Sequence, residues 1–170
     1  MSHLLVTNDF PPKLGGIQSY LWELWRRLDP DTFTVLTTSY EGAAAWDAGQ
    51  PFRVERLHDR MLLPTPSLAR RIDDLALETG ARLVVLDPAL PVGLLGPHLA
   101  RPYAVVLHGA EVTVPGRLPG PNRLLRRVLR GAQLVVAAGR YPAAEGERAA
   151  GRALPVVHVP PGVDVTRFQP

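Results

Sequence analysis

Residues Asn8–Tyr20 read Asn-Asp-Phe-Pro-Pro-Lys-Leu-Gly-Gly-Ile-Gln-Ser-Tyr. The apolar run Leu4–Val6 before this stretch predicts a buried strand, and the amphipathic run Ile17–Leu28 at its end predicts a helix. The paired glycines Gly15 and Gly16 allow the backbone to approach a ligand closely. Because the first N–H groups of a helix have no partner within it, a strand, glycine turn and helix together can hold an anion. A glycine turn that merely connects two elements is the alternative.

The composition is that of an ordinary globular protein. The chain has 170 residues, of which 46% are apolar and 21% charged, and this predicts one domain over residues 1–170. It has no cysteine, which excludes disulfides and thiolate metal sites, and no cluster of His, Asp or Glu has the spacing of metal ligands. No apolar run approaches the ~20 residues that span a bilayer. We therefore expect a cytoplasmic protein without a metal, and a net charge of +3 is too small to indicate nucleic-acid binding.

Apolar runs alternate with amphipathic ones along the whole chain. Strands are predicted at residues 3–7, 33–38, 52–57, 83–86, 103–107, 134–137 and 156–159. Helices are predicted at 17–28, from Pro66 to Gly80, at 121–130 and at 142–150, with a short helix at 91–99 and a loop at 41–51. This alternation predicts an α/β fold: a Rossmann-like, doubly wound, mainly parallel sheet of about seven strands with helices on both faces.

Two stretches of polar residues and glycine follow predicted strands, namely Asn8–Gly16 and His108–Glu111. In doubly wound sheets, ligands bind beyond the carboxyl ends of the strands, near the switch in strand order. We expect the strands at 3–7, 83–86 and 103–107 to be central and adjacent. The glycine turn and His108 should then border one crevice.

Four polar residues are candidates for that crevice. His108 directly follows four apolar residues, so it emerges where a buried strand ends, and it either contacts a sugar or phosphate or simply caps the strand. Glu111 either orients His108 or binds hydroxyls, unless it is a solvated loop carboxylate. Asp9 and Gln18 flank the glycine turn and are suited to the hydroxyls of a polyol, although Asp9 can equally brace the turn.

The segment 117–130 places apolar residues between five arginines. This pattern predicts a basic amphipathic helix that suits an anionic membrane surface. The alternative is an ordinary helix with one face on the sheet and one in water. The arginines are Arg117, Arg123, Arg126, Arg127 and Arg130.

Three stretches together resemble a known family. They are Asn8–Tyr20, the sequence His-Gly-Ala-Glu at 108–111, and Pro-Pro-Gly-Val-Asp at 160–164 with Arg167-Phe168 nearby. Their order and spacing are similar to the amino-terminal half of a family-4 retaining glycosyltransferase of the GT-B fold, in which two Rossmann-like domains face a cleft. The glycine turn is most similar to that of the actinobacterial phosphatidylinositol monomannoside mannosyltransferases.

The resemblance implies a role for each candidate. Gly15 and Gly16 would approach the diphosphate and sugar of a nucleotide-sugar donor, and His108 would contact the donor sugar at the reacting centre. Asp9, Gln18 and Glu111 would lie on the acceptor side. The donor would be GDP-mannose, used as a substrate with no cofactor, and the acceptor a phosphatidylinositol mannoside.

The resemblance also implies a place in the cell and a missing part. The basic segment would dock on the inner face of the plasma membrane. The chain stops at Pro170, where such enzymes cross into a second, donor-binding domain. Since sugar transfer depends above all on stabilising the charge of the leaving diphosphate, we expect the 170-residue chain to fold but not to turn over. A stand-alone nucleotide- or polyol-binding module and a peripheral membrane protein without catalysis are the alternatives.

Overall fold

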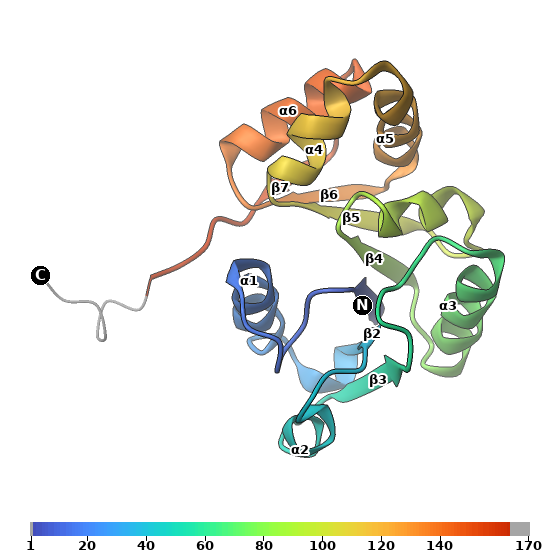
Figure 1. Cartoon of the computed structure of the whole chain (residues 1–170), viewed down its shortest axis with the longest axis vertical. Helices are drawn as coiled ribbons and strands as arrows, with labels where there is room; N and C mark the ends of the chain where they lie inside the picture. The colour runs from blue at the N-terminus through green and yellow to red at the C-terminus, as the bar shows by residue number, and fades with distance from the viewer. Residues whose placement is uncertain (1, 164–170) are drawn as a thin grey trace, which may run out of the picture.

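The computed structural model describes residues 2–163 as seven parallel strands and the helices that cover them (Figure 1). The sheet order is β3-β2-β1-β4-β5-β6-β7, so β1, β4 and β5 lie next to one another as predicted. The strands are β1 (His3–Thr7), β2 (Phe33–Thr38), β3 (Arg53–Leu57), β4 (Leu83–Asp87), β5 (Tyr103–Leu107), β6 (Leu134–Ala137) and β7 (Val156–His158).

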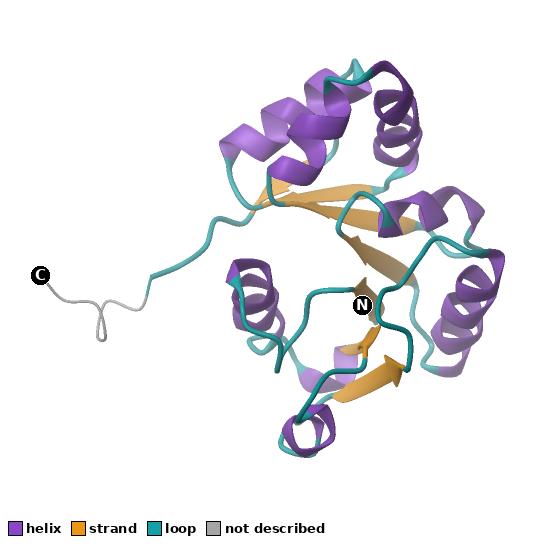
Figure 2. Ribbon diagram, in the orientation of Figure 1, coloured by secondary structure: helices purple, strands orange, loops and turns teal. Residues whose placement is uncertain are grey.

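The helices cover the two faces of the sheet (Figure 2). On one face, α1 (Gly16–Trp25) and α2 (Ala43–Asp47) enclose an apolar cluster with Leu5, Val35 and Val106. The other face is covered by α3 (Pro66–Glu78), the 3₁₀ helix η2 (Val92–His98), α4 (Ala110–Gly116), α5 (Pro119–Gly131) and α6 (Arg140–Ala150). A short 3₁₀ turn, η1 (Pro30–Thr32), leads into β2.

The predicted doubly wound α/β sheet is therefore confirmed, and the reason lies in the central strands. All five residues of β5 and the last four of β1 and β4 are buried. Consecutive residues of a strand point to opposite faces, so a strand covered on both faces is apolar along most of its length; Thr7 and Asp87, at the carboxyl ends of β1 and β4, are the buried polar residues of these three strands. The helix α3 likewise begins and ends where its sequence predicts: the Thr65 hydroxyl accepts from the Leu68 N–H at 3.2 Å, and Gly80 follows at a φ of 66°.

Two helices were missed by the sequence prediction, and one was predicted too long. The loop predicted at 41–51 contains the helix α2, because Trp46 packs edge-on against Phe10 and Trp22 and anchors the alanines beside it. The helix predicted at 17–28 ends at Trp25, since Trp25 is the last apolar residue that reaches the core.

The third error concerns the basic segment. The helix α4 fills residues that were given no helix, because Val112 is fully buried and anchors it. Arg117 caps the carboxyl end of α4 and does not belong to α5, so the five arginines do not lie on one helix.

Candidate functional site

Three neighbouring strands end in polar side chains that bond to one another. Thr7, Asp87 and His108 lie at or just past the carboxyl ends of β1, β4 and β5. The Asp87 carboxylate has no exposed surface; its Oδ2 accepts from the Thr7 hydroxyl at 2.7 Å, and its Oδ1 lies 2.6 Å from Nε2 of His108. The parallel register, which pairs Thr7 with Asp87, brings these groups to the same rim of the sheet.

The imidazole of His108 is held on two sides. Its ring meets the ring of Tyr20 from α1 edge-on, with 5.4 Å between the centroids. The Tyr20 hydroxyl donates to the Val159 carbonyl at 2.8 Å, and burial followed by the charge of Asp87 raises the pKa of Tyr20 to about 12. Within residues 2–163, Nδ1 of His108 has no hydrogen-bond partner, and the side chain is 12% exposed. One ring nitrogen is therefore left for a ligand.

Charge at the site favours a proton on His108. Burial lowers the pKa of His108, but the hydrogen bond and charge of Asp87, helped by Glu111 and Asp9, outweigh burial and raise the pKa above its usual value. Burial also raises the pKa of Asp87, against the hydrogen bonds from His108 and Thr7. The two residues therefore titrate as one unit.

Glu111 holds the turn between β5 and α4. Its carboxylate accepts from the N–H groups of His108 and Gly109, the two residues that lead into α4. Gly109 has a φ of 149°, in the region that side chains rarely adopt, so glycine is required there. The carboxylate fixes the backbone of His108 rather than its imidazole.

The glycine turn is braced by its own side chains. Asp9 Oδ1 accepts from Gln18 Nε2 at 2.6 Å and from Lys13 Nζ at 2.8 Å. Gln18 is 7% exposed and lies beneath the turn, so a Cβ on Gly15 would meet its Oε1 at 2.2 Å. Among residues 2–163, a Cβ on Gly16 would meet no atom within 4 Å, and the N-cap residue Gly15 offers α1 no side-chain cap. The first turn of α1 therefore faces open space and is free for an anion.

Arg56 ties the same loop to the edge of the sheet. Its guanidinium binds Asp47 through two hydrogen bonds of 2.8 Å and donates to the carbonyls of Thr38 and Pro11. Phe10 is buried between the rings of Trp46 and Phe52. The bonds of Arg56 and the burial of Phe10 thus hold this part of the loop in place.

The structure brings together most of the residues that the sequence singled out. The N–H of Asp9 donates to the Thr7 hydroxyl at 2.9 Å, so one chain of bonds runs from Gln18 through Asp9, Thr7 and Asp87 to His108. Sequence reasoning assigned no role to Thr7 or Asp87. The available signal was an aspartate ending a fully apolar strand between two strands that carry other candidates.

The basic segment lies elsewhere and divides into two kinds of arginine. Arg126 and Arg130 donate to the carbonyls of Ala149 and Ala150 and so join α5 to α6. Arg117 lies 4.0 Å from Glu145. No hydrogen bond or ion pair involves the side chains of Arg123 or Arg127 within residues 2–163.

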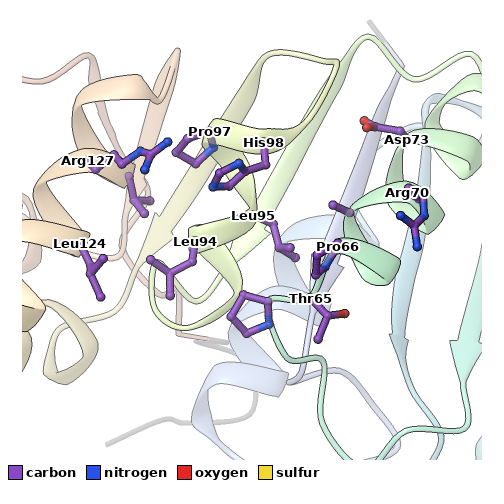
Figure 3. Close-up of a pocket in the computed structure, with 13 residues that line it drawn as sticks. Thr65, Pro66, Arg70, Asp73, Leu94, Leu95, Pro97, His98, Leu124 and Arg127 are labelled. Carbon is purple, nitrogen blue, oxygen red and sulfur yellow. The ribbon is translucent and has the colours of Figure 1, made fainter.

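A groove lies beside α5, between this helix, α3 and η2 (Figure 3). It has a volume of about 470 Å³, and Leu94, Leu95 and Leu124 line it together with Arg127, which reaches toward Pro97 and His98. Neither this groove nor a second hollow beside Met61 and Leu63 includes His108 or the glycine turn. The bond network, and not either hollow, therefore connects the turn to His108.

Comparison with known proteins finds relatives of this chain, although no protein-family model matches it. The chain is 38% identical, over 98% of its length, to the GDP-mannose-dependent alpha-(1-6)-phosphatidylinositol monomannoside mannosyltransferase of Mycolicibacterium smegmatis. It is 33% identical over 98% of its length to a GDP-mannose-dependent mannosyltransferase of Corynebacterium glutamicum that acts on the monoacylated lipid. The chain belongs to the family of these phosphatidylinositol monomannoside mannosyltransferases. The chain spans about half the length of those relatives, 46% and 45% respectively.

Solved structures of other glycosyltransferases share the fold. Anabaena Alr3699/HepE, solved with UDP, superposes with a TM-score of 0.71 at 21% identity, over 98% of this chain and 45% of that one. Sucrose-phosphate synthase from Thermosynechococcus elongatus superposes with a TM-score of 0.68 at 14% identity, over 100% of this chain and 50% of that one. In both cases the match is one half of the larger protein. The sequence-based expectation of half a GT-B fold is therefore confirmed.

Asp164, Arg167 and Phe168 lie outside the described residues. Within residues 2–163, no helix is long and apolar enough to cross a membrane, and no three His, Asp or Glu side chains are grouped as metal ligands.

Proposed function

We propose that this chain is the acceptor-binding half of a retaining mannosyltransferase that moves mannose from GDP-mannose to a phosphatidylinositol mannoside. The observation that carries the proposal is the network from the glycine turn to His108 at the carboxyl rim of the sheet. The named activity of relatives that are 33–38% identical supports the choice of donor and acceptor.

The donor is assigned to the open N-terminus of α1 and to His108. The uncapped N–H groups of α1 suit the charge of a diphosphate, and Gly16 leaves them uncovered. The free Nδ1 of His108 suits a sugar hydroxyl or a phosphate oxygen at the reacting centre. The acceptor is assigned to the side of Asp9, Gln18 and Glu111. Since the carboxylates of Asp9 and Glu111 already accept hydrogen bonds, acceptor hydroxyls would share or replace these bonds.

The test uses the product of the complete reading frame that carries this chain, here called the extended protein. We expect it to transfer mannose from GDP-mannose to phosphatidylinositol mannoside, with slower or no transfer from UDP-glucose. We expect residues 1–170 alone to fold without turnover. Transfer by residues 1–170 at the rate of the extended protein would refute the division into halves. A reading frame that ends at Pro170 would favour a nucleotide- or polyol-binding module.

We further propose that the chain works as a peripheral protein on the inner face of the plasma membrane, and that α5 contacts the lipid. Leu118, just before α5, and Leu124, within it, are 51% and 50% exposed. Arg123 and Arg127 lie on α5, and their side chains make no hydrogen bond or ion pair within residues 2–163. The apolar groove beside Leu124 and Arg127 offers further surface to a lipid. Exposed arginines near apolar side chains attract anionic lipid at about 1 kcal/mol each.

Changing Arg123 and Arg127 together to glutamine is expected to weaken binding to vesicles with anionic phospholipid. Two lost charges correspond to roughly 2 kcal/mol, or about 30-fold in affinity, as measured by vesicle sedimentation at low salt.

Arg126 and Arg130 provide the matched control, because they bond to α6. Changing both to glutamine should lower the melting temperature while leaving most vesicle binding intact. Equal loss of vesicle binding in the two double variants, or no loss in either, would contradict the proposed lipid contact.

A further inference from the structure

Asp87 is the most deeply buried charged residue of the network. It has no exposed surface, and both its oxygens are occupied, by the Thr7 hydroxyl and by the imidazole of His108. A buried carboxylate is costly unless it is fully hydrogen-bonded. It lies behind His108, so it acts on a ligand only through the imidazole.

We propose that Asp87 is the positioning residue of this site: it binds Nε2 of His108 and thereby presents Nδ1 to the substrate. The step to a substrate rests on the proposed sugar transfer, whereas the orientation of the ring does not. The class of ligand follows from the nitrogen that is left: Nδ1 suits an oxygen of a sugar hydroxyl or of a phosphate.

The surroundings of the ring allow this one orientation. Thr7 fixes Asp87 from the side of β1, and Tyr20 packs edge-on against the imidazole from α1. A ring turned about its Cβ–Cγ bond would place a carbon against Asp87 Oδ1 and leave a fully buried carboxylate short of one partner. Holding the reacting group in place in this way raises rates, since a displacement of about 1 Å can cost on the order of 10²-fold.

The charges around the ring decide whether Nδ1 donates or accepts. The facing groups are Asp87 on β4, Glu111 on α4, Asp9 in the glycine turn and the neutral phenol of Tyr20 on α1. Because Asp87 raises the pKa of His108, Nδ1 carries a proton and donates up to a pH above the usual histidine value. The stability that the hydrogen-bonded pair of His108 and Asp87 adds is fully present below the ordinary pKa of histidine. It is lost as the pH rises through the raised pKa of His108.

The first test needs only the unmodified chain. Nitrogen-15 NMR of residues 1–170 distinguishes the two histidine tautomers, and above its pKa His108 is expected to carry its proton on Nε2. A neutral His108 protonated on Nδ1 would overturn the proposal. His58 and His98, which are exposed, serve as internal references.

The second test compares Asp87→Asn with Thr7→Val. Asp87→Asn is expected to lower the pKa of His108 and to mix its tautomers, whereas Thr7→Val removes a bond to Asp87 but none to the ring and should keep the Nε2 tautomer. If both variants lower the melting temperature and neither changes His108, Asp87 is merely structural and the proposal is wrong. If Asp87→Asn does not fold, the tautomer in the unmodified chain decides.

In the extended protein, Asp87→Asn is expected to lower kcat by about 10- to 100-fold with little change in the KM for the acceptor, because the ring is misplaced while the binding surfaces remain. A kcat equal to that of the unmodified protein would overturn the proposal. An inactive unmodified protein would instead refute the proposed sugar transfer and leave the NMR result on Asp87 standing.

Discussion

Replacing His108 by alanine in the extended protein is expected to reduce kcat/KM for mannose transfer by at least about 10²-fold. Preorganised hydrogen-bond donors at a reacting centre contribute effects of this size. The side chain is 12% exposed at the carboxyl rim of β5, so its removal spares the apolar core but leaves the buried Asp87 carboxylate with its bond from Thr7 and without the one to His108. Initial rates at several concentrations of GDP-mannose separate the effects on kcat and KM.

His58→Ala is the matched control for this variant, because His58 is exposed in the connection between β3 and α3. It should keep the activity of the unmodified protein. A His108→Ala variant that folds and retains more than about a tenth of the unmodified rate would exclude His108 from the reacting centre.

Replacing Gly16 by valine is expected to weaken the binding of GDP-mannose by about 10²-fold, or about 2.7 kcal/mol. A Cβ there meets no atom of residues 2–163 within 4 Å, so the fold leaves room for the start of a side chain, which would occupy the space in front of the first turn of α1. A diphosphate could then no longer reach the uncapped N–H groups. Titration calorimetry of the extended protein with GDP-mannose measures the loss.

Gly49→Val is the control, because Gly49 is an exposed glycine after α2 and a Cβ there meets only a carbonyl at 3.5 Å. Both variants should melt within a few degrees of the unmodified protein. If Gly16→Val binds GDP-mannose with unchanged affinity, the donor does not approach the N-terminus of α1.

The sheet followed from the sequence because strands covered on both faces leave little choice of residue. Four strands, at 3–7, 33–38, 103–107 and 134–137, have the same bounds in the structure as in the prediction. Helix ends were less predictable where tertiary contacts set them. Trp25 is the last buried residue of α1, so the helix ends there. Trp46 packs on Phe10 and thereby stabilises α2 in an alanine-rich stretch that the sequence predicts as a loop.

Part of the site could be predicted from the pattern of polar and apolar residues. His108 and the glycine turn stand out in the sequence, because polar residues interrupt apolar runs there. Asp87 was visible too, but its function depends on a partner 21 residues away and on strand order, which periodicity does not give. The partners of Arg126 and Arg130 could not be predicted from the sequence either. They are backbone carbonyls, which every residue has, so the identity of the residue does not indicate them.

Tyr20 connects two parts of the molecule that are far apart in the chain. Its ring packs edge-on against the imidazole of His108, and its hydroxyl donates to the Val159 carbonyl just past β7. If the backbone after β7 shifts at Val159, the phenol of Tyr20 must either rotate with it or lose its hydrogen bond to the Val159 carbonyl. A displacement of the backbone at Val159 would therefore be transmitted through the ring of Tyr20 to the imidazole of His108. Tyr20 and Val159 are 139 residues apart in the sequence, yet a single hydrogen bond joins them in space.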